Sequence, residues 1–150
     1  MRVVVQLVKE SSVTVDGDVK GEIKTGLLVL IGITHNDEES DVEWVFDKLL
    51  KLRVFKDGSG KMNKSVSDVN GAILLVSQFT LFASTKKGNR PSFTNSAPPE
   101  EAEKLYNYAT SYLKIKYKGP VQTGVFGAMM EVNLVNDGPV TLIIDSQNKE

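Results

Sequence analysis

Cysteine is absent from this 150-residue chain, and histidine occurs only once, as His35. Without cysteine the protein cannot form disulfides, thiolate nucleophiles or cysteine-type zinc sites, and it suits a reducing compartment. Serine-type triads need a histidine base, and most catalytic zinc sites need more than one imidazole. Because His35 stands in a turn-like sequence before a predicted helix, we interpret it as a surface residue rather than a base. Catalysis would therefore use hydroxyls, amides, carboxylates, lysines or the substrate itself, and we predict no metal and no cofactor.

Long apolar runs and a strong net charge are also missing. No stretch approaches the roughly 20 apolar residues that cross a bilayer, and the N-terminal apolar run is interrupted at Gln6. We therefore expect no membrane association and a cytoplasmic location. The net charge of −1 argues against a strongly basic nucleic-acid binder, because phosphate neutralisation supplies most non-specific affinity. With 41% hydrophobic residues, the chain is predicted to form one domain, residues 1–150.

Two short stretches are nevertheless locally basic. The first holds Lys86, Lys87 and Arg90 in a polar segment, and the second holds three lysines within residues 114–118. Either set could contact a few phosphates, although surface lysines are usually only solvated. For the first set the two interpretations are equally favoured, and for the second we favour solvation alone.

The first half of the chain predicts strands followed by a helix. The pair Asp16-Gly17 between β-branched residues predicts a hairpin. The aliphatic run 27–33 is typical of a strand buried on both faces. Apolar residues at helical spacing predict a helix over residues 37–52, begun by a capping-box-like pair, Asn36 and Glu39.

The second half adds another helix between strand-like segments. Residues 98–101 open it with prolines and an acidic first turn, and Gly119-Pro120 ends it. Strand patterns cover residues 73–81 and 121–145, with a turn at Gly138-Pro139 in the latter. Because strands and helices do not alternate regularly, we predict an α+β fold: an antiparallel or mixed β-sheet curled towards a barrel, with two packed helices.

The segment after the apolar run 73–76 is the first candidate site. Its side chains emerge where a strand meets solvent, a common place for binding and catalysis. Thr80 is the obvious hydroxyl nucleophile, but without a nearby base we favour a positioning role for it. Phe79 could stack on a base or fill the core. The four catalytic candidates are Ser77, Gln78, Phe79 and Thr80.

The second candidate is Gly138-Pro139, which follows Asn136-Asp137. Proline is the residue before which a cis peptide bond costs least, about 0.5–1 kcal/mol relative to trans. A cis bond here would present two carbonyls on a rigid surface that carries no side chain. Such a surface could read the chirality of a substrate without contacting its side chain.

Four separated motifs together resemble those of one family. They lie at residues 77–81 (SQFTL), 88–93 (GNRPSF), 123–130 (TGVFGAMM) and 136–141 (NDGPVT). In this order they are similar to the motifs of the D-aminoacyl-tRNA deacylases, also called D-tyrosyl-tRNA deacylases. The resemblance extends over essentially the whole chain.

The resemblance implies a homodimeric cytoplasmic editing enzyme that hydrolyses the ester of D-aminoacyl-tRNA, or of glycine mischarged on tRNA-Ala. It implies that Gly138 and Pro139, joined by a cis bond, enter the active site of the other subunit and reject L-residues. Residues 77–80 match the segment that binds the adenosine and the ester, and Phe126 and Met130 match pocket positions. It also implies that water is activated with help from the tRNA ribose 2′-hydroxyl, which fits a chain with few general bases.

Two positions depart from the family pattern. Leu7 follows Gln6 where relatives carry an arginine that braces the Gly-Pro carbonyls, and Ser96 stands where relatives often carry alanine. Leucine cannot donate those hydrogen bonds, so we expect weaker bracing. Two other hypotheses stay open beside the editing enzyme. One is a non-catalytic dimeric module that binds aminoacyl-adenosine or RNA ends, and the other is a conventional threonine esterase.

Overall fold

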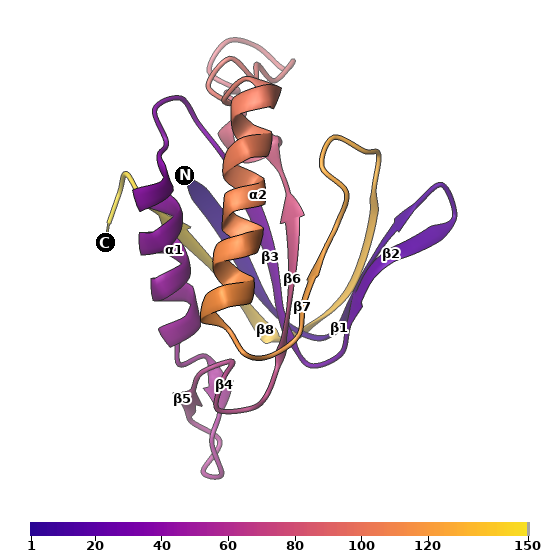
Figure 1. The fold of residues 1–150 in the computed structure, drawn as a ribbon, viewed down its shortest axis with the longest axis vertical. Helices are drawn as coiled ribbons and strands as arrows, with labels where there is room; N and C mark the ends of the chain where they lie inside the picture. The colour runs from indigo at the N-terminus through magenta and orange to yellow at the C-terminus, as the bar shows by residue number, and fades with distance from the viewer. Residues whose placement is uncertain (150) are drawn as a thin grey trace.

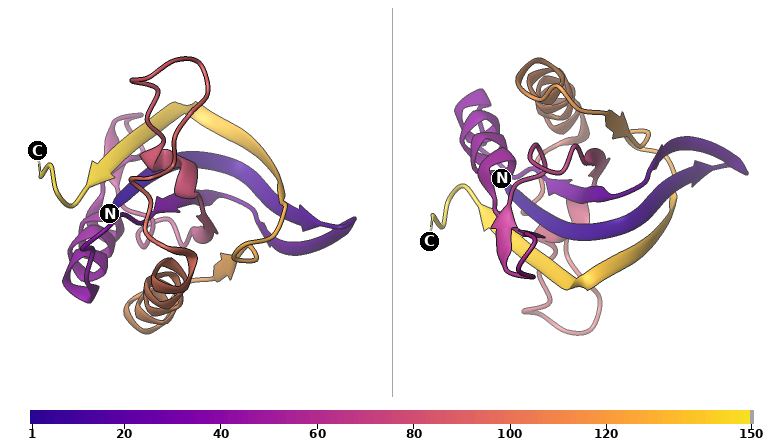
Figure 2. Two further views of the ribbon diagram at one scale, coloured as in Figure 1. Left: turned by 90° about the horizontal axis from the view of Figure 1, so that it is seen from above. Right: turned by 90° about the horizontal axis from the view of Figure 1, so that it is seen from below.

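A six-stranded mixed sheet forms the centre of the computed structural model, which describes residues 1–149. The longest strands, β1 (Arg2–Val15) and β8 (Glu131–Asp145), pair antiparallel along most of their length. On its other side, β1 pairs antiparallel with β3 (Gly26–Gly32) through its first half and with β2 (Asp18–Ile23) through its second. One long strand therefore joins three neighbours, and Figure 2 shows the bend that it gives to the sheet.

Parallel pairing continues the sheet beyond β3. Strand β6 (Ala72–Ser77) pairs with β3, and β7 (Val121–Thr123) pairs with β6. A separate small hairpin of β4 (Phe55–Lys56) and β5 (Met62–Lys64) projects beyond the end of α1 (Figure 1). The main sheet has the order β2-β1-β3-β6-β7, with β8 on β1, and it curls into a nearly closed barrel (Figure 2). The predicted α+β class with a curled mixed sheet is confirmed.

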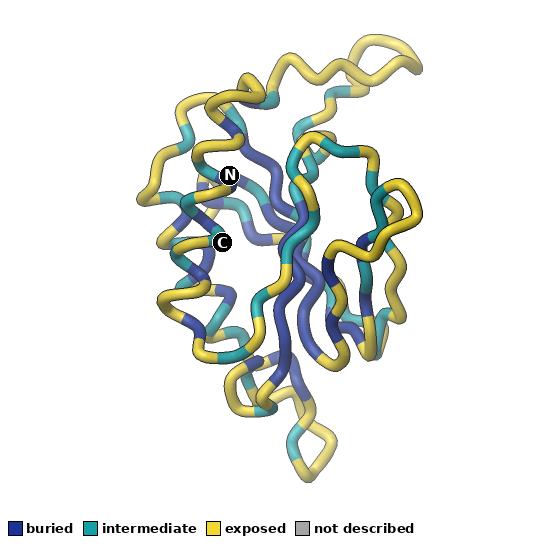
Figure 3. The backbone as a smooth tube through the Cα atoms, turned by 45° about the vertical axis from the view of Figure 1, so that its right-hand side comes forward, coloured by how far each residue is buried: buried dark blue, intermediate teal, exposed yellow. Residues whose placement is uncertain are grey.

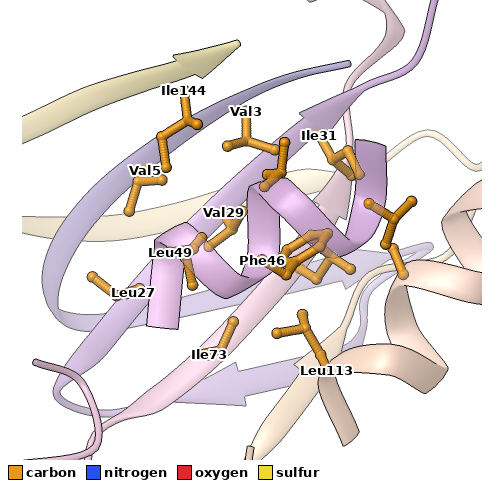
Figure 4. Close-up of a cluster of buried hydrophobic side chains, with 14 of the residues drawn as sticks. Val3, Val5, Leu27, Val29, Ile31, Phe46, Leu49, Ile73, Leu113 and Ile144 are labelled. Carbon is orange, nitrogen blue, oxygen red and sulfur yellow. The ribbon is translucent and has the colours of Figure 1, made fainter. Parts of the chain in front are cut away.

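Two helices, α1 (Glu39–Lys51) and α2 (Pro99–Lys116), lie side by side against the same face of the sheet (Figures 1 and 2). Apolar residues at helical spacing bury one face of each helix. In Figure 4, Phe46 of α1 and Leu113 of α2 point towards Ile73 and the neighbouring strands. Figure 3 shows the buried residues concentrated in the strands and on the inner faces of the helices.

Several local predictions are confirmed by the backbone. Asp16 and Gly17 join β1 to β2 with φ of +50° and +83°, the sign that a two-residue type I′ hairpin requires. The strand over residues 27–33 is almost wholly buried, as expected for a strand covered on both faces. Both predicted helices are present, with ends one to three residues from those expected. None of the helices within residues 1–149 is long and apolar enough to span a bilayer.

Two boundary predictions were wrong. The first helix begins with Glu38 as its N-cap, because Glu38 and Asp41 form the capping box, whereas Asn36 takes a left-handed φ of +64° in the preceding turn. The strand predicted over 73–81 ends at Ser77. There the chain turns into a short 3-10 helix, η1 (Phe79–Phe82), so period-two alternation no longer describes it.

The predicted turn at Gly138-Pro139 was also wrong. Strand β8 runs through this position, because β1 is long enough to pair with it on both sides. Gln6 pairs with Thr141 and Val8 with Asn136, which leaves residues 137–140 without partners on β1. These four residues, which we call the protrusion, bulge out of a continuous strand instead of reversing the chain.

Candidate active site

The wall of the candidate site is built where β6 ends and η1 begins, at residues 77–82, which we call the pocket wall. The Gln78 main-chain N–H donates to the Ile31 carbonyl of β3 at 2.7 Å, which fixes the change of direction. Gly32 makes this close approach possible, because a Cβ there would lie 2.9 Å from Leu81 Cβ. On the other side, Arg2 donates from Nη1 to the Leu81 carbonyl at 3.0 Å.

A cavity of about 440 Å³ opens beside the pocket wall. It falls within the roughly 300–1,000 Å³ typical of small-molecule sites, and its lining is predominantly apolar. No ionisable side chain lies among the lining residues that the structure describes. The cavity is lined by Ile31, Ile33, Ser77, Gln78, Phe79, Phe93, Ser96, Ala97, Pro98, Pro99, Ala102, Phe126 and Gly127.

Polar groups and two phenylalanines form the rim. The Gln78 side-chain amide donates to the Thr80 hydroxyl, and the Ser96 hydroxyl donates to the Phe79 carbonyl at 2.9 Å. Phe79 and Phe93 meet edge to face with ring centroids 5.1 Å apart, yet they remain 55% and 41% exposed. Exposed aromatic faces beside a cavity provide a stacking surface for a planar ligand.

Phe126 also lines the cavity, and its ring lies 5.6 Å from that of Tyr106, centroid to centroid. The Tyr106 hydroxyl donates to the Leu75 carbonyl at 3.0 Å. Burial raises the pKa of Tyr106 to about 12, so this hydroxyl stays protonated at neutral pH. Tyr106 therefore supports the wall as a hydrogen-bond donor and offers no base to the cavity.

His35 is exposed, in agreement with its interpretation as a surface residue. Its Nε2 lies 2.8 Å from the Thr94 carbonyl oxygen, and the Thr34 hydroxyl donates to the Asn95 carbonyl. These bonds attach the segment that carries Phe93 to the end of β3. His35 thus positions a rim residue from outside the cavity.

The structure brings together only some of the predicted site residues. Ser77, Gln78, Phe79 and Phe126 line one cavity, with Thr80 bonded to Gln78 beside it. Met130 does not line the cavity. It packs against a second buried cluster on the opposite face of β3 and β6, where its Sδ would be 2.8 Å from a Cβ added at Gly124.

Gly138 and Pro139 lie away from the cavity of their own chain. Both are exposed on the protrusion, and the peptide bond between them is cis. The Asn136 side-chain amide closes the base of the protrusion, because its Nδ2 donates to the Leu7 carbonyl at 2.9 Å and to the Val140 carbonyl at 3.0 Å. The Leu7 side chain itself is buried in the main core.

Sequence reasoning missed two contributors to this arrangement. Phe93 was identified only as part of a motif, and its contact with Phe79 joins segments that are distant in sequence. Asn136 was recognised only as a neighbour of Gly138-Pro139, and no role was predicted for its side chain. Its position just before an unpaired glycine-proline segment is the signal that could have identified it, because asparagine side chains commonly bond to nearby main-chain groups.

The fold and the cavity together define a class of protein. The chain is a small α+β domain with an apolar pocket and a polar rim, and the described residues that line the pocket include no ionisable side chain.

Comparison with known proteins identifies the family. The family model described as D-Tyr-tRNA(Tyr) deacylase matches residues 4–145. A D-aminoacyl-tRNA deacylase of Chloroherpeton thalassium is 55% identical over 150 residues, covering 100% of this chain and 99% of the relative. One of Desulfitobacterium hafniense is 56% identical over 147 residues, covering 98% of each. The chain therefore belongs to the D-aminoacyl-tRNA deacylases, which are hydrolases, and the predicted family is confirmed.

Two solved structures share the fold. One is the "c-Myc DNA Unwinding Element Binding Protein", with a TM-score of 0.92 and 44% identity over 97% of this chain and 98% of that chain. The other is described as "a probable eukaryotic D-amino acid tRNA deacylase", with a TM-score of 0.80 and 17% identity over 95% and 97%. At 17% identity the second likeness concerns the fold alone.

Proposed function

We propose that this protein is a homodimeric editing enzyme that hydrolyses the ester between a D-amino acid and the terminal adenosine of tRNA. Glycine mischarged on tRNA-Ala is a second substrate, and L-aminoacyl-tRNA is rejected. The observation that carries the proposal is an apolar cavity, with no ionisable side chain among its described lining residues, next to a polar segment and two exposed aromatic rings. Family membership supplies the substrate class.

The aminoacylated adenosine suits the two kinds of surface at the cavity. Phe79 and Phe93 offer ring faces to the adenine, and base stacking of this kind is typical of single-stranded nucleic-acid sites. Ser77 and Gln78 offer a hydroxyl and an amide to the ester. Phe126 adds an apolar ring to the lining of the cavity. The protein thereby holds the ester at a fixed angle to an incoming water.

The proton transfers of the reaction are assigned to the substrate. Water attacks the ester carbonyl carbon, the bond to the ribose 3′-oxygen breaks, and that oxygen receives the proton that the water loses. The neighbouring 2′-hydroxyl relays this proton, because none of the lining side chains within residues 1–149 can act as a base near neutral pH. Positioning of the reactants is then the main contribution of the chain.

Chiral selection is assigned to the protrusion of the partner subunit. Gly138 and Pro139 are exposed and have no cavity of their own chain to enter. Main-chain atoms that occupy the space of an L side chain would exclude every L-residue and tolerate many D-residues. Exposed apolar residues near the protrusion supply area for the contact between subunits, which typically buries about 1,600 Å² in total. They are Leu134, Val135, Leu142 and Ile143.

Substrate turnover tests the activity. Purified protein is incubated with D-Tyr-tRNA, L-Tyr-tRNA and Gly-tRNA-Ala, and the remaining ester is measured over time. We expect loss of the D-tyrosyl and glycyl esters at enzymatic rates while the L-tyrosyl ester persists at its spontaneous rate. Hydrolysis of D and L esters at equal rates would contradict chiral selection, and absence of all turnover would contradict the enzyme.

Mixing of variants tests the exchange between subunits. Pro139→Ala should leave the pocket active but allow L-Tyr-tRNA hydrolysis, whereas Phe126→Asp should inactivate its own pocket and leave its protrusion intact. When excess Phe126→Asp protein is exchanged into Pro139→Ala dimers, each active pocket faces an intact protrusion. L-Tyr-tRNA hydrolysis should then fall towards zero. Unchanged L-hydrolysis after verified exchange would mean that the protrusion acts on its own chain.

A non-catalytic nucleic-acid-binding module is the second candidate function. It is favoured by the name of the solved relative that is 44% identical, which describes a DNA-binding protein. The same incubation separates the two candidates. Binding of D-Tyr-tRNA that protects the ester from hydrolysis would support the module and exclude the editing enzyme.

A further inference from the structure

The loop of residues 84–92, which we call the basic loop, carries a concentration of positive charge that the proposed reaction does not use. Lys86, Lys87 and Arg90 are all exposed, and none of them forms an ion pair within the part of the chain that the structure describes. The loop contains no acidic residue, although the whole chain has a net charge of −1. The three cations are therefore available to an external anion.

The ends of the basic loop are fixed. Ser84 and Ser92 form an isolated β-bridge, with the Ser84 N–H donating at 2.8 Å and the Ser92 N–H at 2.9 Å. The next residue, Phe93, lines the cavity and contacts Phe79. His35 then holds the Thr94 carbonyl at 2.8 Å. The basic loop is thus attached directly to the rim of the cavity.

Charge is distributed unequally around the cavity. Pro98 and Pro99 line the side from which α2 begins, and the first turn of α2 carries Glu100 and Glu101, both exposed. Viewed from above, the basic loop extends away from α2 and over β8 (Figure 2). Lys104 pairs with Glu100 at 3.5 Å and offsets part of this negative charge. A polyanion that leaves the cavity is therefore attracted mainly on the side of the basic loop.

The size of the cavity limits how much of a nucleic acid can enter it. A volume of about 440 Å³ suits one small ligand, so only the end of a nucleic acid can enter. The phosphates that precede this end must therefore pass over the rim. Phosphate contacts supply most of the affinity of nucleic-acid complexes and fix the register of the strand.

We propose that the basic loop binds the phosphates of the RNA strand that leads into the cavity, with Lys86 and Lys87 as the principal contacts. This inference rests on the proposed function for the identity of the strand. The basic loop would direct the 3′ end towards Phe79 and Phe93 and would act on binding rather than on the chemical step.

The test compares two double variants. Lys86→Ala/Lys87→Ala removes two charges from the basic loop, and Lys114→Ala/Lys118→Ala removes the same charge at the opposite end of α2 (Figure 1). All four lysine side chains are exposed and none is in an ion pair of the described structure, so both proteins should fold normally. Each is assayed on D-Tyr-tRNA and on D-tyrosyl-adenosine, which has no phosphate.

We expect the loop variant to raise KM for D-Tyr-tRNA several-fold, with kcat and the rate on D-tyrosyl-adenosine unchanged. The dependence of log affinity on log salt concentration should become shallower by about 0.7 for each single-strand phosphate contact that is lost. The control variant should match the unmodified protein in all four measurements. Equal effects of both variants, or an unchanged salt dependence, would overturn the proposal.

A second measurement separates this proposal from the proposed function. Uncharged tRNA binds without any ester to hydrolyse, so its salt-dependent affinity is measured for the same three proteins. A loss confined to the loop variant supports the basic loop even if no D-Tyr-tRNA is hydrolysed, a result that would overturn only the editing enzyme. Equal affinity of all three proteins for uncharged tRNA would overturn the basic loop even if hydrolysis is normal.

Discussion

The pocket wall and the protrusion both form where a strand leaves its ladder, but they are supported very differently. Three separate parts of the fold hold the main chain of the pocket wall: it donates a hydrogen bond to the Ile31 carbonyl and accepts bonds from the side chains of Arg2 and Ser96. At the base of the protrusion, the side chain of Asn136 bonds to two carbonyls, and the tip is exposed. The pocket wall is therefore held from several directions within one chain, whereas the protrusion is held at its base and its tip is open to solvent.

Adding a side chain at Gly32, beneath the pocket wall, should have the largest effect on stability and activity. In Gly32→Ala the new Cβ would lie 2.9 Å from Leu81 Cβ and 3.0 Å from the Gln78 carbonyl oxygen, so η1 must move. We expect a loss of about 1–3 kcal/mol in the free energy of unfolding and a large fall in kcat/KM for D-Tyr-tRNA. Urea denaturation and initial rates measure both.

Gly58→Ala is the matched control, because a Cβ at Gly58 would meet nothing within 4 Å. It should leave unfolding and turnover close to those of the unmodified protein. If Gly32→Ala were equally harmless, the close approach of η1 to β3 would not define the pocket wall.

Removing the hydrogen bonds at the base of the protrusion should have the next largest effect. It should change the ratio of D-Tyr-tRNA to L-Tyr-tRNA hydrolysis rates rather than the overall activity. Asn136→Ala removes both hydrogen bonds at its base, each contributing about 0.5–1.5 kcal/mol. We expect L-Tyr-tRNA hydrolysis to rise while D-Tyr-tRNA hydrolysis is retained. Asn136→Asp should have a stronger effect, because a carboxylate would face two carbonyl oxygens. The ratio of D to L rates is the measurement.

Asn133→Ala provides the control on the same strand. The Asn133 carbonyl accepts a bond from Ser11, but this uses the main chain, which the substitution keeps. The D to L ratio should therefore not change. A lower ratio in both variants would indicate a general loosening of β8, and an unchanged ratio in both would exclude Asn136 as a brace of the protrusion.

The same contrast explains what the sequence could predict. Local patterns located the helices, the hairpin at Asp16-Gly17 and the buried strand over 27–33, because each depends on neighbouring residues alone. The bulge in β8 depends on pairing with β1, more than 120 residues away in the chain, so Gly138-Pro139 was expected to be a turn. Period-two alternation likewise could not place the end of β6 at Ser77.

The site was only partly predictable for the same reason. Motif resemblance selected residues 77–79 and Phe126, which the fold brings to one cavity. Met130 belongs to the same motif as Phe126, but it packs on the opposite face of the sheet within this chain. A sequence motif shows which residues are neighbours in the chain. The face of the sheet on which each side chain lies depends on the pairing of the strands around it.

A smaller effect is expected at Thr80. Its hydroxyl accepts a hydrogen bond from the Gln78 amide, and no base lies among the cavity residues that the structure describes. We therefore expect Thr80 to orient Gln78 rather than to act as a nucleophile. Thr80→Ala should lower kcat/KM by the equivalent of about 0.5–1.5 kcal/mol, and Thr80→Ser should restore most of it. Single-turnover rates check this. A fall on the order of a millionfold would instead identify Thr80 as a covalent nucleophile.

The smallest effect is expected at the far end of β8, where Asp145 supports the pocket wall indirectly. Arg2 Nε donates to the Asp145 carboxylate at 2.9 Å, and Arg2 Nη2 lies 2.9 Å from the same oxygen atom. The Nη1 atom of Arg2 donates to the Leu81 carbonyl. Burial acts to raise the pKa of Asp145, but hydrogen bonds from the Gln147 N–H and from Arg2 outweigh it and lower the pKa below 3.8. A carboxyl whose pKa is lower in the folded state stabilises the fold above its unfolded pKa.

That stabilisation is present at neutral pH and is lost as the pH falls below about 4 and through the folded pKa. Because the ion pair is partly exposed, its contribution is about 0–1 kcal/mol. The free energy of unfolding of Asp145→Asn, measured in urea between pH 7 and pH 3, should fall less steeply with acid than that of the unmodified protein. Asp18→Asn removes an exposed carboxylate outside this ion pair and should keep the steeper dependence. Parallel curves for Asp145→Asn and the unmodified protein would show that the pocket wall is held without help from the end of β8.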